Sequence, residues 1–483
     1  MHVSLNFERY LNAASACGPD ARFLLEVIVG VPECRHKPRQ AIRIKSFAKT
    51  LGLDETVVSG GLSELVAAGV LERLIAPRGG QVGRGKVTYV LCPGNEAWLA
   101  DHTYPQHAEL LQALFSGADM TFSVLGRELR KAEPDEPGED EAVAKFKKGK
   151  NLLSGGRGRL SIRNRLLFAV LLSRSDQFGE VQIGVPRLAW LTGMKPEQVK
   201  TRLDRLMMLG LIRRHIPGLS SKVFATGRIE STYFLNIDAL RPQGAIAVHI
   251  TGDGDGKNFT HADLLRRDCT NAKGGILGVE TPNSLVSLLA GQQSRVFLVF
   301  QNLLYRYASR LLSCHWQKLA ADLPVEDSEL IAWIANDFIK FPKSGPAVEN
   351  DLEHEAGPDD VEASFLKDGP DGAADQTCAQ IYELALEVAH EYRSRFGQVN
   401  WVDFATADIR ILPTMDDLGY RAITILFQPV LVGLDRFSVL AERTRGIVEL
   451  WPVANETDLV LQNRMDFGLV SLPRKVRRAM RKQ

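Results

Sequence analysis

The chain has few cysteines, and they are not spaced for metal binding or redox chemistry. Zinc sites and redox pairs usually hold two cysteines with two residues between them, and no pair here has that spacing. The six cysteines are spread along 483 residues, at positions 17, 34, 92, 269, 314 and 378. We therefore expect reduced cysteines, no metal site and no other cofactor.

A long hydrophobic run is also missing. Residues 285–312 form the most apolar long stretch, but Gly-Gln-Gln-Ser-Arg interrupts it at 291–295 and further arginines follow. A membrane-spanning helix needs about 20 apolar residues in succession. The first ten residues lack the basic and apolar regions of a secretory signal. We expect a soluble protein without a membrane partner, in the cytoplasm and associated with the nucleoid.

Catalytic signatures are absent from the sequence as well. There is no Walker loop, no H-E-x-x-H and no G-x-S-x-G. Gly252–Asn258 resembles the start of a calcium loop, but the acidic residues that should follow are missing. We expect that the protein is not an enzyme. A recombinase or nuclease site made of dispersed residues in the C-terminal half is the weaker alternative.

What the sequence does contain is a helix–turn–helix pattern in residues 185–208. Pro186 and Pro196 suit the first turns of two helices, and Gly193 suits the turn between them. In the second helix, apolar residues recur every three or four positions, which predicts one buried stripe: Val199, Leu203, Leu206 and Met207. A strand is expected at 211–216, a flexible basic loop at 217–230 and a second strand at 231–237. A helix pair followed by a hairpin is the outline of a winged helix.

The same pattern occurs earlier in the chain, in residues 46–75. Adding 141 to each number aligns the two segments without a gap, so that Gly52 meets Gly193, Val58 meets Val199 and Leu62 meets Leu203. This spacing is too long for a solenoid repeat. It indicates two copies of one domain, or two domains of one pattern.

Both segments resemble the winged helix-turn-helix superfamily of bacterial DNA-binding proteins. They share a small residue, a Leu-Gly or Thr-Gly turn, the spaced Val, Leu and Leu, and a Gly before the strand. The resemblance covers about 75 residues in each copy and implies DNA binding rather than a particular pathway. Tandem winged helices also occur in plasmid replication initiators, which this chain resembles in that respect only. No family is identified for residues 241–483.

Candidate DNA-binding residues follow from the chemistry of the grooves. Arginine, lysine and glutamine can form paired hydrogen bonds with base edges, and basic or hydroxyl side chains suit phosphates. In the second copy these residues are Lys195, Gln198, Lys200, Thr201, Arg202, Arg205, Ser220, Ser221, Lys222 and Arg228. The second helix of the first copy has no Lys or Arg, so its candidates lie in the glycine-rich hairpin loop: Arg78, Arg84 and Lys86. That copy instead serves as a protein interface in the alternative interpretation.

The expected fold class is mainly α with small β-hairpins (α+β), in which two tandem winged-helix domains are followed by helical C-terminal domains. Blocks of like charge with Pro and Gly predict linkers. The expected divisions are winged helix one at 1–104, helices and a charged linker at 105–159, winged helix two at 160–240, a helical domain at 241–342, an acidic linker at 343–377, and a C-terminal domain with a basic tail at 378–483.

Three functions compete at this point. The first is a sequence-specific transcriptional regulator that reads double-stranded DNA with winged helix two and forms a homodimer. The second is a replication or partition factor of a plasmid or other mobile element, in which both winged helices engage repeated sites as a monomer. The third is a non-catalytic assembly protein that uses its winged helices, or its C-terminal domain, to bind protein partners. Inverted half-sites favour the first function and direct repeats the second, whereas absent salt-sensitive DNA binding favours the third.

Overall fold

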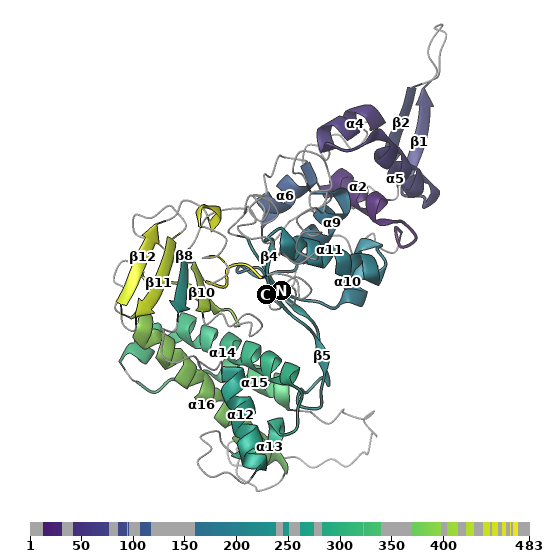
Figure 1. The fold of residues 1–483 in the computed structure, drawn as a ribbon. Helices are drawn as coiled ribbons and strands as arrows, with labels where there is room; N and C mark the ends of the chain where they lie inside the picture. The colour runs from purple at the N-terminus through teal and green to yellow at the C-terminus, as the bar shows by residue number, and fades with distance from the viewer. Residues whose placement is uncertain are drawn as a thin grey trace, which may run out of the picture.

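A computed structural model gives the fold of the chain (Figure 1). It is mainly helical with small sheets, as expected. The structure describes residues 13–30, 42–76, 86–93, 95, 107–116, 160–237, 245–250, 261–274, 283–321, 323–339, 370–397, 403–413, 422–428, 438–444, 447–452, 456–459, 464 and 467–471. The predicted linkers at 131–159 and 343–369 and the basic tail at 473–483 lie outside these residues.

The first unit holds four helices and a hairpin. Its helices are α2 (Pro19–Gly30), α4 (Ile44–Leu51), α5 (Glu55–Ala67) and α6 (Ala108–Ser116). Strands β1 (Leu71–Ala76) and β2 (Lys86–Leu91) pair antiparallel, with Leu71 opposite Leu91 and Ala76 opposite Lys86. A single bridge between Ile42 and Tyr89 lies on the other side of β2. Strand β1 is therefore at the edge of this small sheet.

The second unit repeats this order. It contains α9 (Ile162–Leu172), β3 (Glu180–Gln182), α10 (Val185–Thr192), α11 (Pro196–Met208), β4 (Ile212–Ile216) and β7 (Thr232–Leu235). Its three-stranded antiparallel sheet has the order β3-β7-β4. Between β4 and β7 the chain forms a long arm, residues 217–231, which carries the short strands β5 (Leu219–Ser220) and β6 (Arg228–Ile229).

The spacing of 141 residues holds at the level of whole elements. Helix α4 plus 141 gives the bounds of α10, and α5 plus 141 gives the bounds of α11. Gly52 and Gly193 end the first helix of each pair in the left-handed region, with φ of 63° and 68°. The stripe predicted from the sequence is buried in both copies: Val58, Leu62 and Leu65, and Val199, Leu203 and Leu206.

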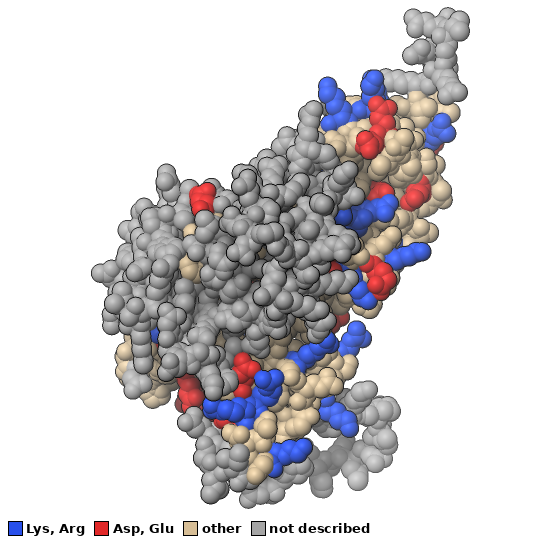
Figure 2. All heavy atoms as spheres, viewed as in Figure 1, with Lys and Arg blue, Asp and Glu red and all other residues tan. Residues whose placement is uncertain are grey.

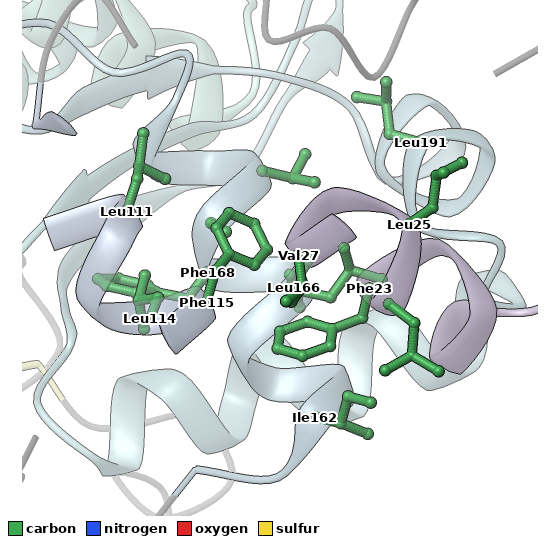
Figure 3. Close-up of a cluster of buried hydrophobic side chains, with 14 of the residues drawn as sticks. Phe23, Leu25, Val27, Leu111, Leu114, Phe115, Ile162, Leu166, Phe168 and Leu191 are labelled. Carbon is green, nitrogen blue, oxygen red and sulfur yellow. The ribbon is translucent and has the colours of Figure 1, made fainter. Parts of the chain in front are cut away.

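Helices α2 and α9, which open the two units, lie against each other in one shared core. Their side chains meet those of α6 and α10 in Figure 3, where Phe23, Phe115, Leu166 and Leu191 converge. The rings of Phe23 and Phe115 are 5.4 Å apart. At the edge of this core Arg163 holds Asp20 with two hydrogen bonds of 2.8 Å. The two units therefore form one packed body.

An arginine from each unit reaches the helix pair of the other. Arg22 is the fourth residue of α2 and donates to the carbonyls of Trp190 and, at 3.2 Å, Leu191 in the last turn of α10. Arg165 is the fourth residue of α9 and donates to the carbonyl of Leu51, the last residue of α4, at 3.3 Å. Equivalent residues making reciprocal contacts are the mark of an approximate two-fold relation. We call this pair of contacts the arginine clasp.

The C-terminal part combines a helical layer with a five-stranded sheet. The helices are α12 (His261–Lys273), α13 (Asn283–Leu289), α14 (Ser294–Ala320), α15 (Ser328–Phe338) and α16 (Pro370–Phe396). The strands are β8 (Ala245–Ile250), β9 (Asp408–Ile411), β10 (Ala422–Gln428), β11 (Ser438–Thr444) and β12 (Ile447–Pro452), in the order β12-β11-β8-β10-β9. Strands β11 and β8 are parallel, and the other pairs are antiparallel.

This sheet corrects the expectation of purely helical C-terminal domains. Strand β8 comes from the segment assigned to a helical domain at 241–342, yet it pairs with β10 and β11 from beyond residue 378. Long helical periodicities dominate this half of the sequence, and strands as short as these give a weak pattern beside them. Helix α16 also begins at Pro370, inside the predicted acidic linker.

Unit two is bound to the C-terminal part by a buried ionic cluster. Glu456, in the 3-10 helix η3 (Glu456–Asp458), accepts a hydrogen bond from Arg213 of β4 at 2.7 Å and another from Arg464 at 3.2 Å. Asn236 also donates to this carboxylate. Arg213, Glu456 and Arg464 are all buried. This cluster fixes the end of the described chain against the sheet of the second unit.

Candidate nucleic-acid interface

The outward side of α11 carries the residues predicted to approach DNA. Lys195, Gln198, Lys200 and Thr201 are exposed there. Their local contacts are weak or leave polar atoms open: the Gln198 side chain accepts from the Lys195 amide at 3.2 Å, and Lys200 forms an exposed ion pair with Glu197 at 2.8 Å. Thr201 donates to the Glu197 carbonyl at 2.9 Å. Exposed pairs of this kind contribute little stability and rearrange readily.

Arg202 does not belong to this outward set, which corrects its assignment as a base-reading residue. Its guanidinium donates to Asn164 at 2.8 Å and to Ser161 at 3.4 Å, both at the start of α9. Burial lowers the pKa of Arg202, and the charges of Arg163 and Arg205 lower it further. Arg202 therefore holds α11 against α9. Arg205, one turn of the outward face further on, is partly buried and takes part in contacts within the protein.

The arm of the second unit is docked on the C-terminal part, which the sequence did not predict. Val223 and Phe224 are buried in the C-terminal core, and the Phe224 ring lies 5.8 Å from that of Phe338. The Ala225 amide donates to the Asp337 carbonyl at 2.8 Å. In Figure 1 this arm, marked by β5, extends from the second unit to the region of α15. Its tip is thus part of an internal interface.

The predicted contact residues of this arm have different fates. Ser221 is partly buried, and its hydroxyl donates to Gln292 at 3.3 Å and accepts from the Val223 amide at 3.2 Å. Ser220, Lys222 and Arg228 are exposed on the same arm. The expectation of a flexible loop reaching toward phosphates is wrong for the tip, because two apolar residues in the loop bind it to the C-terminal core.

The predicted contacts of the first hairpin are described only in part. Arg78 and Arg84 lie outside the described residues. Lys86 is the first residue of β2 and pairs with Ala76 in β1. These three residues stay predictions.

The structure adds basic residues that the sequence analysis did not select. Arg43, Lys45 and Lys49 are exposed on and just before α4, which has no acidic residue. Lys and Arg side chains stand over this region in Figure 2. On α10, Arg187 lies 4.3 Å over the ring of Trp190, which is 43% exposed. The signal was present in the sequence as cations, and an aromatic residue, on the outward side of the first helix of each pair.

The outward faces are not uniformly basic. Glu55 begins α5, and Glu197 and Asp204 lie on the exposed side of α11. On α11 these two carboxylates stand among Lys195, Lys200 and Arg205, so the net charge of its outward side is close to neutral. Sequence preference would then depend more on particular hydrogen bonds than on general attraction to phosphate.

Other kinds of site are not found in the described part of the chain. It contains no group of three or more His, Cys, Asp or Glu residues that could hold a metal ion. None of the described helices is long and apolar enough to span a membrane. Comparisons of the chain with family models, curated proteins and solved structures found no match.

Proposed function

We propose that the two units are winged helices and that the protein binds double-stranded DNA with them. One observation carries the proposal: two helix pairs of identical bounds, 141 residues apart, each turn through a left-handed glycine and each precede an antiparallel strand pair. Each pair buries the same apolar stripe and leaves the opposite side of its second helix exposed. In this motif the second helix enters the major groove and the first crosses the backbone.

The exposed residues suggest a division of roles. We assign base contacts to α11, where Gln198 and Arg205 can present hydrogen-bonding groups to base edges. Lys195 and Lys200 are placed for phosphates on either side of the groove. In the first unit α5 has no cation, so Arg43, Lys45 and Lys49 around α4 are the proposed phosphate contacts. The first unit then contributes position more than base recognition.

A transcriptional regulator is the first candidate for the role of such a protein. The buried contacts between the second unit and the C-terminal part support it, because a conformational change in the C-terminal part would reach α11 through β4. A replication or partition factor of a mobile element is the second candidate. It is favoured by the shared core, which presents both helix pairs from a single chain.

The arginine clasp bears on the shape of the target. Because the clasp relates the two units by an approximate two-fold rotation, one chain that engaged a duplex with both units would meet half-sites of opposite direction. Inverted half-sites therefore no longer require two chains. The number of chains on one site, rather than site symmetry, separates the two candidates.

The test is a salt titration of binding to a mixed duplex and to a selected duplex, measured by fluorescence anisotropy. The variant is Lys195→Ala/Lys200→Ala/Arg205→Ala. Lys273→Ala/Lys318→Ala, two exposed lysines of the C-terminal part, is the control. We expect affinity to fall with salt, and the slope to shrink by about 0.9 for each phosphate contact removed. Absence of binding to either duplex at low salt would overturn the proposal and favour a protein-assembly role.

A further inference from the structure

Strand β1 of the first unit has an outer edge that is bare in the structure. Among the described residues β1 pairs with β2 alone, and the bridge from Ile42 occupies the far side of β2. Glu72, Arg73, Leu74 and Ile75 are all exposed. The exposed fractions of Leu74 and Ile75 are 41% and 61%, which is high for large apolar side chains in a strand. Such an edge offers unpaired backbone groups to another strand.

The equivalent strand of the second unit is covered. Strand β4 is also at the edge of its sheet, but Ile216, which aligns with Ile75, is only 2% exposed. The C-terminal part of the chain supplies the cover. Arg213 of β4 donates to the Glu456 carboxylate at 2.7 Å and to the Leu469 carbonyl at 3.2 Å. The same position in the repeated fold is thus protected in one unit and left open in the other.

We propose that β1 pairs edge to edge with β1 of a second copy of this chain, antiparallel across a two-fold axis. The strand reads Leu-Glu-Arg-Leu-Ile-Ala, and its exposed residues complement their own reversed order. With the axis between Arg73 and Leu74, Glu72 lies diagonal to the partner subunit's Arg73 on one face of the joined sheet. On the same face Leu74 lies diagonal to the partner subunit's Ile75. The axis repeats both pairs on the other face.

The charges select this register. An axis through Arg73 would place two arginine side chains directly opposite each other, which is destabilising. The proposed register instead gives two Glu–Arg pairs and two Leu–Ile pairs, the kinds of cross-strand pair that stabilise sheets. A two-stranded hairpin is marginal alone, and the joined sheet would have at least four strands. This inference stands apart from DNA binding, since it uses none of the proposed DNA contacts.

The experiment measures the mass of the full chain by sedimentation equilibrium over a wide concentration range. Ile75→Lys places a charge on the edge, and Ile331→Lys is the matched control on α15, where Ile331 is 47% exposed. We expect a monomer–dimer equilibrium in which Ile75→Lys raises the dissociation constant by at least about tenfold. Ile331→Lys should leave it unchanged.

A charge swap separates pairing from loss of folding. Glu72→Arg should weaken the dimer, because it brings like charges together across the axis. Glu72→Arg/Arg73→Glu restores opposite charges in reversed order and should recover the dimer. A wild-type chain that stays monomeric throughout the concentration range would overturn the proposal. So would a dimer that neither Ile75→Lys nor Glu72→Arg weakens.

Discussion

At the scale of single residues, Arg202 separates a packing role from a recognition role. Its guanidinium is spent on Asn164 and Ser161, and Asn164 is almost fully buried. The sequence contained a hint, since Arg202 follows Val199 by three positions and precedes Leu206 by four. It therefore lies at the margin of the apolar stripe rather than opposite it. Side-chain direction at such a margin depends on the neighbouring helix, which the sequence alone does not place.

Arg202→Ala should lower the stability of the protein rather than weaken DNA contacts directly. Removing the guanidinium leaves the Asn164 side chain buried without this donor, which costs about 1–3 kcal/mol. Urea unfolding measures the loss. Lys195→Ala, at an exposed position on the same helix, is the control and should change stability by less than about 0.5 kcal/mol. Equal stability of the two variants would show that Arg202 does not hold α11 to α9.

Glu26 is a second residue with a measurable signature. It is fully buried in α2, and neither of its carboxyl oxygens has a hydrogen-bond partner within the described structure. Burial raises the pKa of Glu26 well above its usual range. As pH rises, the unfolded chain loses this proton first, so the folded state loses stability until pH reaches the raised pKa.

Glu26→Gln should therefore stabilise the protein at pH 7 and not at pH 4. At pH 4 both side chains are neutral in the folded and the unfolded chain, so the two proteins should differ little. At pH 7 the variant avoids the cost of keeping a carboxyl protonated, and we expect a gain of about 1–3 kcal/mol. Thermal unfolding at both pH values tests this, and a gain of the same size at pH 4 would contradict it.

At the scale of elements, the sequence predicted the repeated helix pairs well and the C-terminal sheet poorly. Helices α10 and α11 follow from local signals: Pro186 and Pro196 at their starts, Gly193 between them and one apolar stripe. Strands β8 to β12 acquire their meaning only by pairing over long sequence distances, as β8 does with β11. The docking of the arm was missed for the same reason, although Val223 and Phe224 are unexpected residues for a solvated loop.

The turn at Gly193 joins local conformation to the arginine clasp. Its φ is 68°, and an added Cβ would lie 2.7 Å from the Arg22 Nε and 2.8 Å from the Cys17 carbonyl oxygen. Gly193→Ala should thus cost strain and disturb the clasp, about 1–3 kcal/mol in total. Gly227→Ala is the control, because φ there is 67° but nothing lies within 4 Å of an added Cβ. Urea unfolding should find Gly193→Ala the less stable; equal losses would mean that the clasp tolerates the change.

At the scale of the whole molecule, two devices join three parts that lie in a row in Figure 1. The arginine clasp and the shared core join the first two units, and the cluster around Glu456 joins the second unit to the C-terminal part. Neither was predictable from the sequence, because a contact such as Arg213 with Glu456 links residues 243 positions apart. The repeat itself gave no indication that its copies face each other.

Glu456→Gln should weaken the hold of the C-terminal part on the second unit. It leaves the buried Arg213 and Arg464 without their shared negative charge, a change that typically costs about 3–5 kcal/mol. Hydrogen exchange should rise in β4 and in residues 467–471. Glu329→Gln is the control, since Glu329 pairs with Arg310 at an exposed position and should cost below about 1 kcal/mol. Unchanged exchange in β4 would show that this cluster does not fasten the two parts.

The most direct test of the account is a hydroxyl-radical footprint on a selected duplex. It should use the Ile75→Lys chain, which we expect to be monomeric, with the number of bound chains checked by light scattering. We expect one chain to protect two half-sites of opposite direction, separated by about one helical turn or a multiple. One protected half-site per chain, or two in the same direction, would contradict the joint use of the two units across the arginine clasp.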